Sequence, residues 1–237
     1  MGLKELYKFC QHSWYGRMLV NIGKWFIARD AFHRKLKIHS KGSLRINKWV
    51  YGKNNILVVG EKACLDKVLI KIIGSNNVIH IGANTIIGER CRILLFGNNL
   101  NLTIGEDCTF SHDDEILVQE NHSSVTIGDD CMFSHHINIR TSDAHPIYSL
   151  NSHKRTNTAK NITIGNHVWV TADVIIQKGT VIGNGCIVGA RSIVNSNYAS
   201  NSSEASSDIN NIIIAGAPAR IVKNNIYWKR SFDKNDG

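Results

Sequence analysis

The chain has 237 residues, enough for one domain of ordinary size, and its 28 Lys and Arg residues outnumber its 19 Asp and Glu residues for a formal net charge of +9. The excess charge lies mostly in residues 1–41, so the rest of the chain is nearly neutral and lacks the basic body of a nucleic-acid-binding protein. No apolar run approaches the length of a membrane span, and the first residues lack the apolar core of a signal peptide, so we expect a cytoplasmic protein.

Residues 1–43 are predicted to form a basic amphipathic helical arm. Within residues 3–38 apolar residues recur at helical spacing, and Lys and Arg occupy the other faces. The first of these apolar residues are Leu3, Leu6, Tyr7, Cys10 and Trp14. Such an arm can dock on the body or on a neighbouring subunit, lie against the inner face of the cytoplasmic membrane, or contact an acidic polymer. The sequence leaves these three alternatives open.

Residues 44–222 carry a repeat of six residues, which is most regular near its C-terminal end. β-Branched aliphatic residues recur there at every sixth position: Ile164, Val170, Ile176, Ile182, Val188 and Val194. A helix would spread such positions over three directions, and a single strand would need alternation over an unusual length. Period six suits short straight segments joined by turns, three of which close a coil of about 18 residues that pairs in parallel with the next coil. We therefore predict a mainly β protein built as a parallel β-helix.

Two insertions are expected to interrupt the coils. Glycines that end successive apolar segments are 22, 23 and 23 residues apart, which we interpret as a coil plus an Asn- and Gly-rich turn. These glycines are Gly60, Gly82, Gly105 and Gly128. From Ile127 to its next equivalent, Ile164, the interval is 37 residues, and the excess forms a polar loop at residues 145–161. A loop of that length on a compact solenoid is usually functional. A second insertion, rich in Ser and Asn, occupies residues 195–210.

Four of the six cysteines occupy the same position of the repeat: Cys91, Cys108, Cys131 and Cys186. We interpret them as small buried hydrophobic residues with reduced thiols.

The tail at residues 223–237 is aromatic and basic. We expect it either to form a capping helix or to dock on a neighbouring subunit.

Histidines are candidates for chemistry, because seven of the eleven lie in the middle coils or the first insertion. Three of them could converge on zinc at a subunit interface, but no pair has the spacing of a metal-binding motif, so we expect no metal and interpret most as surface residues. His145 differs, because it opens the loop at residues 145–161 and precedes one of the two prolines. An imidazole there can reach substrate while the coils fix its backbone, and it can take a proton from a hydroxyl. Asp143 either orients that ring or ends the strand.

The hexads occur together with four longer motifs: Asp143-Ala-His-Pro146, Ile164-Gly-Asn-His-Val-Trp169, Val188-Gly-Ala-Arg-Ser-Ile-Val194 and Ala215-Gly-Ala-Pro-Ala-Arg-Ile-Val222. In this order they resemble the left-handed β-helix, hexapeptide-repeat acetyltransferases, in the branch of the galactoside and maltose acetyltransferases. The stretch from Asp143 to Leu150 with the motif ending at Trp169 is closer still to bacterial capsule O-acetyltransferases, particularly those acting on polysialic acid. The resemblance covers about residues 50–230. It, and not the period, implies that the coils wind in the left-handed sense.

The resemblance implies roles for individual residues. His145 matches the general base of the family, which takes the proton of a sugar hydroxyl as it attacks the thioester of acetyl-CoA directly, without a covalent acyl-enzyme. Trp169 matches the tryptophan of the passage shared by acetyl-CoA and the acceptor, where we also place Asp143. Further matches concern acetyl-CoA alone: Ala172 and Ala190 along the pantetheine groove, and Arg191, Arg220 and Lys223 near the phosphates. Because the family is trimeric, we expect a homotrimer with active sites between subunits.

The leading hypothesis is an acetyl-CoA-dependent O-acetyltransferase of a bacterial capsular polysaccharide, with a sialic acid as candidate sugar. The sugar acetyltransferases carry an acidic residue where this chain has Asn121 and His122, so their acceptor contacts do not transfer. Three alternatives stay open: acetylation of a small nucleotide-linked sugar, a carbonic anhydrase on the same fold, and a structural β-helix without enzymatic activity.

Overall fold

The computed structural model describes residues 36–199 and 209–232. Nearly all of the predicted helical arm and much of the insertion at residues 195–210 therefore lie outside the described residues. Strand β1 (Leu36–Ser40) already pairs in the stack, so residues 36–38 are strand and not helix, and the solenoid begins before the predicted start at residue 44. The described residues contain no helix, and hence none that could cross a bilayer.

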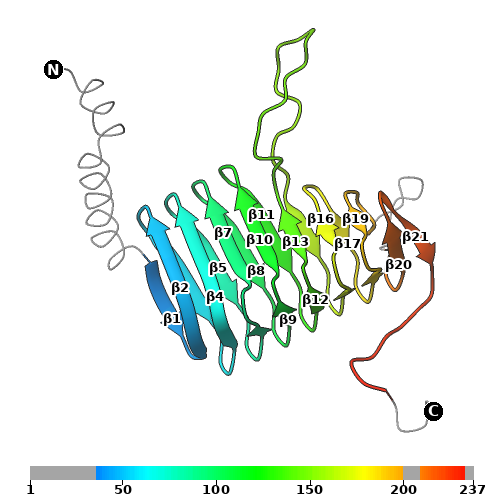
Figure 1. The fold of residues 1–237 in the computed structure, drawn as a ribbon, viewed down its shortest axis with the longest axis horizontal. Helices are drawn as coiled ribbons and strands as arrows, with labels where there is room; N and C mark the ends of the chain where they lie inside the picture. Colours follow the sequence, from blue (N-terminus) through cyan, green and yellow to red (C-terminus); the bar gives the residue numbers. More distant parts are fainter. Residues whose placement is uncertain (1–35, 200–208, 233–237) are drawn as a thin grey trace, which may run out of the picture.

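The strands form three faces of one solenoid, numbered here in the order in which the chain meets them (Figure 1). The first face contains β1, β3 (Asn55–Val59), β5 (Val78–Ile81), β8 (Asn101–Ile104), β11 (Ser124–Ile127), β14 (Ile162–Ile164) and β17 (Val181–Ile182). The second face contains the first parts of β2 (Ser43–Tyr51) and β4 (Cys64–Ile73), then β6 (Ile86–Ile87), β9 (Thr109–His112), β12 (Met132–His135), β15 (Trp169–Val170), β18 (Ile187–Val188), β20 (Ile213–Gly216) and β21 (Ala219–Lys223). The third face contains the second parts of β2 and β4, then β7 (Arg92–Phe96), β10 (Glu115–Gln119), β13 (Asn138–Arg140), β16 (Ile175–Ile176) and β19 (Ile193–Val194).

Three edges connect these faces: the first edge joins the first face to the second, the second edge joins the second to the third, and the third edge leads back to the first. Strand pairing confirms the predicted coil lengths. Asn101 pairs with Ser124, 23 residues later, whereas Thr163 pairs with Val181, 18 residues later. The longer coils have longer strands on the third face, as β7 with 5 residues and β16 with 2 residues show. The handedness of the coil stays a prediction.

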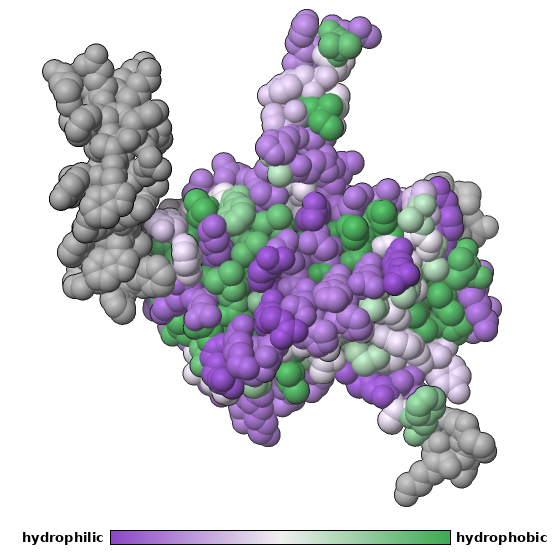
Figure 2. Space-filling model, viewed as in Figure 1, coloured by the Kyte–Doolittle hydropathy of each residue, from purple (hydrophilic) through white to green (hydrophobic). Residues whose placement is uncertain are grey.

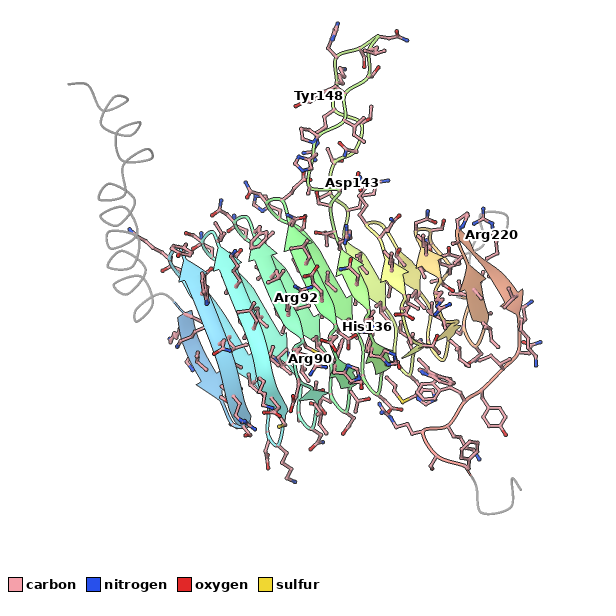
Figure 3. All side chains as sticks on the ribbon, in the orientation of Figure 1. Arg90, Arg92, His136, Asp143, Tyr148 and Arg220 are labelled. Atoms are coloured by element: carbon pink, nitrogen blue, oxygen red, sulfur yellow. The ribbon has the colours of Figure 1, made fainter. Side chains whose placement is uncertain are left out.

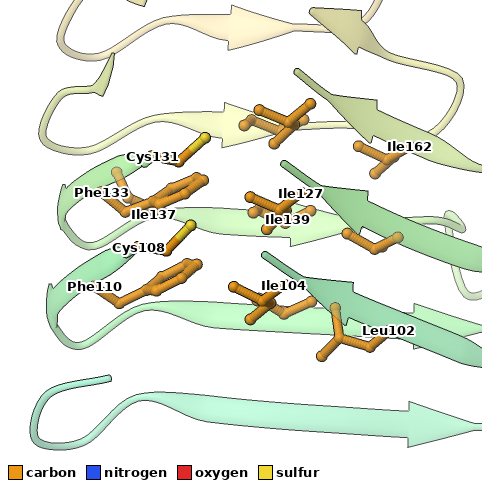
Figure 4. Close-up of a cluster of buried hydrophobic side chains, with 14 of the residues drawn as sticks. Leu102, Ile104, Cys108, Phe110, Ile127, Cys131, Phe133, Ile137, Ile139 and Ile162 are labelled. Carbon is orange, nitrogen blue, oxygen red and sulfur yellow. The ribbon is translucent and has the colours of Figure 1, made fainter. Parts of the chain in front are cut away.

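Each coil turns its aliphatic residues into a shared interior, as the six-residue period predicts. The six residues of the C-terminal series, Ile164 to Val194, are at most 1% exposed. The four cysteines of the repeat are buried and are free thiols, as expected. Beside Cys108 and Cys131, the rings of Phe110 and Phe133 stack with centroids 4.2 Å apart (Figure 4). Since each fully buried aliphatic side chain contributes roughly 1.5–3 kcal/mol, the stacking of coils holds the fold.

The C-terminal end of the stack is closed by a hairpin and a tail. Strand β21 pairs antiparallel with β20, across a turn that contains the cis peptide bond Ala217–Pro218. Residues 224–232 contain no helix, so the predicted capping helix is wrong for this part of the tail. These residues dock on the first edge of their own chain, because Trp228 contacts His167 and Arg230 contacts Asp130.

Asp114 is an acidic side chain inside the stack at the second edge. It is 2% exposed, and its Oδ1 accepts a hydrogen bond of 2.8 Å from the Ile137 N–H. Burial raises the pKa of Asp114 from 3.8 to about 7, because the charged carboxylate loses its water, and the hydrogen bond from Ile137 opposes this only in part. The folded chain therefore holds a proton at Asp114 over a pH range in which the unfolded chain has released it.

We expect the contribution of Asp114 to the free energy of unfolding to fall as the pH rises from about 4 through about 7. The stabilising contribution of a raised pKa is complete below the unfolded value and is lost as the pH passes the folded value. Urea unfolding at several pH values checks this, and Asp114→Asn should flatten the profile. Glu89→Gln is the control, because the hydrogen bond from Lys67 lowers the pKa of Glu89, so its contribution changes with pH in the opposite sense. An identical pH profile for the wild type and Asp114→Asn would contradict the assignment.

Candidate active site

Residues 141–161 leave the third edge as one long excursion between β13 and β14 (Figure 1). Val125 pairs with Ile162 across it, 37 residues later, so the stack continues unbroken beneath the insertion. The two limbs pair with each other: Tyr148 and Arg155 form an antiparallel bridge, and the Thr156 N–H donates to the Ile147 carbonyl at 2.8 Å. The predicted loop at residues 145–161 is thus the larger part of a mostly hydrophilic hairpin that projects from the body (Figure 2).

His145 lies on the outgoing limb near the base of this excursion. It follows a turn at Ala144, whose φ is 67°. The His145 N–H donates to the Asp143 carbonyl at 2.8 Å, and the His145 carbonyl accepts a bond of 2.8 Å from Asn157 Nδ2. His145 is exposed, and its ring makes no hydrogen bond to another described residue. The backbone is therefore fixed while the imidazole stays available to a substrate.

Asn157 joins the two limbs at the base of the excursion and is 8% exposed. Besides the bond to the His145 carbonyl, its Nδ2 donates to the Asp143 carboxylate at 2.9 Å, and its Oδ1 accepts from the Ile147 N–H at 2.7 Å. One side chain thus holds the Asp143 carboxylate, the carbonyl of His145 itself and the N–H two residues after it. The sequence analysis did not identify this residue, because a single Asn in a polar loop carries no recognisable signal.

Two ion pairs connect the excursion to the coils beneath it. Arg155 donates bonds of 2.7 and 2.6 Å to the Glu120 carboxylate and holds the pKa of Glu120 at about 2. Lys178 pairs with Asp143 and lowers its pKa, and both carboxylates are therefore charged at neutral pH. Asp143, labelled at the base of the excursion in Figure 3, thus contacts Lys178 and Asn157. It makes no hydrogen bond to the His145 ring in the described residues, so it fixes the base of the excursion and does not orient the imidazole.

Trp169 lies on the opposite side of the same chain. It begins β15 on the second face, where it pairs with Met132 on one side and Ile187 on the other. The excursion leaves from the third edge, which borders the first and third faces but not the second. One chain therefore does not bring His145 and Trp169 together, and a site that uses both requires two chains.

The residues matched to acetyl-CoA lie on the same side as Trp169. Ala172 and Ala190 occupy the second edge on successive coils, and the Arg191 N–H donates to the Ala172 carbonyl at 3.0 Å. Arg220 and Lys223 are exposed on β21, at the C-terminal end of the second face (Figure 3). These five residues share the C-terminal part of the second face and second edge, which leaves His145 and Asp143 on the other side.

The second edge also carries a column of charged side chains, of which the sequence analysis identified only Arg191. Its stacked residues have φ between 53° and 62°: Lys67, Arg90, Asp113, His136, Asp173 and Arg191. Arg90 and His136 of this column are labelled in Figure 3. Arg90 binds Asp113 at 2.7 Å, and His136 lies 3.2 Å from Asp173. The rings of the adjacent His112 and His135 stack with centroids 5.1 Å apart. No group of three or more His, Cys, Asp or Glu side chains within the described ranges has the arrangement of a metal site. Such exposed pairs contribute little to stability.

No family model matches the chain. Among curated proteins, a polysialic acid O-acetyltransferase of Escherichia coli O1:K1 / APEC is 48% identical over 93 residues, which are 39% of this chain and 27% of that protein. A polysialic acid O-acetyltransferase of Neisseria meningitidis is 52% identical over 40 residues, which are 17% of this chain and 19% of that protein. The matched stretches therefore span only about a quarter and a fifth of the length of these relatives.

Among the solved structures that match the chain are two acetyltransferases of polysialic acid. The structure of the polySia specific acetyltransferase NeuO is 30% identical, with a TM-score of 0.67 over 85% of each chain. The structure of the polysialic acid O-acetyltransferase OatWY is 28% identical, with a TM-score of 0.53 over 85% of this chain and 94% of that one. Both matches extend well beyond the stretches shared with the curated relatives.

Proposed function

We propose a function for this chain on the basis of its family: it belongs to the hexapeptide-repeat acetyltransferases, the family of NeuO. The proposed reaction is the transfer of acetyl from acetyl-CoA to a sugar hydroxyl of a bacterial capsular polysaccharide. A polymer that contains sialic acid is the proposed acceptor. The two relatives and the two structures described above are named as acetyltransferases of polysialic acid, which supports this choice. The proposed compartment is the cytoplasm, with residues 1–43 as the candidate contact to the inner face of the membrane.

His145 is the proposed general base. As the acceptor oxygen attacks the thioester carbonyl, the imidazole takes the hydroxyl proton, and the tetrahedral oxyanion then collapses with cleavage of the C–S bond. The imidazolium returns its proton to the departing thiolate of CoA. An exposed ring on a fixed backbone supports this role. Direct transfer is favoured over an acyl-enzyme because the five described cysteines are buried or half-buried in the stack.

The proposed active site lies between two protomers of a homotrimer. His145 would come from one protomer, and Trp169 with the acetyl-CoA residues from the next. The observation that carries this proposal is that the excursion leaves from the edge opposite the face of Trp169. Ala172 and Ala190 would contact the pantetheine arm of acetyl-CoA. Its phosphates would be bound by the exposed cationic side chains of Arg191, Arg220 and Lys223.

The proposed function is tested with purified full-length protein, acetyl-CoA and polysialic acid. Mass spectrometry should detect acetyl groups on the saccharide, and their number should increase with time. A neutral glucan of similar length is the control acceptor and should stay unmodified. Release of CoA without acetylation of polysialic acid would contradict the proposed acceptor. Absence of both products would contradict the proposed reaction.

A further inference from the structure

An aromatic notch lies beside Trp169, where the tail runs along the first edge next to the second face. It has a volume of ≈ 460 Å³. One wall is formed by Met132 and Trp169 of the solenoid, and the other by Tyr227, Trp228, Lys229 and Phe232 of the tail. We call it the tail notch. Apart from Trp169, none of these side chains has a role in the proposed reaction.

Trp228 and Arg230, two positions apart in the tail, hold this wall against the first edge. Trp228 is 7% exposed, stacks on His167 with ring centroids 4.0 Å apart, and donates from Nε1 to the His167 carbonyl at 3.0 Å. Arg230 donates to the Asp130 carboxylate at 2.7 Å and to the Thr109 hydroxyl at 3.0 Å. Because neighbouring residues of an extended chain point to opposite sides, fastening the even-numbered residues turns Tyr227 and Lys229 away from the edge. Tyr227 is accordingly 80% exposed.

The walls of the tail notch suit a sugar ring with a negative charge. The indole rings of Trp169 and Trp228 have centroids 5.9 Å apart, and their planes are inclined to each other at 44°. The Phe232 ring is a further aromatic surface, because this residue is 94% exposed. Aromatic faces of this kind pack against the C–H groups of a pyranose ring. Lys229 Nζ lies 5.8 Å from the centroid of the Tyr227 ring, where it can pair with a sugar carboxylate. Residues 220–232 carry four cations and no acidic residue: Arg220, Lys223, Lys229 and Arg230.

The position of the tail notch separates it from the donor residues. From β21 the tail passes Asn211, then His167, then Asp130, so it runs back toward earlier coils. The tail notch accordingly uses Met132, one coil before Trp169, whereas Ala190 and Arg220 lie on coils after it. Donor and acceptor would therefore approach Trp169 from opposite directions along the solenoid.

We propose that the tail notch binds a sugar of the acidic acceptor polymer, at a subsite beyond the sugar that is acetylated. This inference rests on the proposed function. It makes the tail a determinant of chain length in the acceptor, because only a polymer long enough to reach the reacting hydroxyl and the tail notch together gains from both contacts.

Kinetics of the full chain with a long polysialic acid fragment and with a single sialic acid test this subsite. Tyr227→Ala should raise the KM for the long fragment about fivefold, the effect of losing one aromatic contact, and leave the KM for acetyl-CoA and the single-sugar kinetics unchanged. Tyr227→Phe keeps the ring and should behave as the wild type. Lys229→Glu should raise the KM for the fragment about tenfold at low salt. Lys71→Glu is the matched control, because Lys71 Nζ also lies over an aromatic ring, 5.5 Å from the centroid of Phe96, but on the third face.

An unchanged KM for the fragment in Tyr227→Ala and Lys229→Glu would overturn the proposal, and so would a rise in the KM for acetyl-CoA, which would assign the tail notch to the donor. Binding of the fragment, followed by tryptophan fluorescence without acetyl-CoA, separates this test from that of the reaction. If the wild type acetylates no saccharide, the proposed function is wrong. The subsite then stands only if the fragment binds to the wild type and Tyr227→Ala weakens that binding. Absence of binding to the wild type overturns the subsite as well.

Discussion

Alanine in place of His145 is expected to lower the rate of acetyl transfer by about 10²–10⁴-fold, the usual contribution of a general base. The acceptor hydroxyl would then have to attack without an imidazole to take its proton. The fold should be unaffected, because His145 is exposed and its ring makes no hydrogen bond to a described residue. The measurement is the turnover number with acetyl-CoA and polysialic acid, with the melting temperature recorded on the same samples.

The matched control for this change is His153→Ala. His153 is a second exposed histidine of the same excursion, beyond the base at which His145 is held. Its replacement should leave turnover within about twofold of the wild type, as surface substitutions usually do. Near-normal turnover of His145→Ala would mean that a different group accepts the proton.

Asn157→Ala is expected to lower kcat by about 10–10²-fold, because small displacements of a reacting group have effects of that size. The change removes the hydrogen bonds that hold the His145 carbonyl, the Asp143 carboxylate and the Ile147 N–H. The imidazole itself remains, but its backbone is no longer held in one conformation. The KM for acetyl-CoA should not change, because the proposed donor residues lie on the other side of the chain, and this split between kcat and KM is the diagnostic measurement.

Asn151→Ala serves as the control for Asn157→Ala, because Asn151 is an exposed asparagine at the far end of the same excursion. Its loss should leave both constants unchanged. If Asn157→Ala kept the kcat of the wild type, the contact would only stabilise the hairpin. A parallel rise in the KM for acetyl-CoA would instead indicate a general disturbance of the solenoid.

The interior of the solenoid was predictable because each coil repeats the geometry of the one before. A buried position then recurs at a fixed interval, and Ile164, Ile176 and Val188 are buried as that interval requires. Irregular ends give no such signal. Leu36–Ser40 is too short to show a period and follows a stretch with helical spacing, so its strand was missed. The docking of Trp228 and Arg230 depends on His167 and Asp130, which are far away in sequence, so no local pattern of the tail could reveal it.

The residues of the candidate site likewise fall into those that the sequence revealed and those that it did not. His145 was identified because it stands where the repeat is interrupted, and Trp169 because it belongs to a motif. Asn157 acts through hydrogen bonds across the base of a hairpin, and the pairing of its limbs is not encoded in any repeat. Apart from Arg191, the column on the second edge was missed for another reason. The position with φ near 60° is filled there by Lys, Arg, Asp and His instead of the Gly or Asn that usually mark such turns.

Activity of mixed assemblies tests the shared site most directly. His145→Ala and Trp169→Ala chains are first measured separately and are then produced together so that they assemble at random. If His145 of one protomer works with Trp169 of the next, every mixed trimer contains one intact site, and the mixture should regain about a quarter of the wild-type activity. If the mixture shows no more activity than the two variants measured separately, the two residues do not meet across a subunit boundary and the account is wrong.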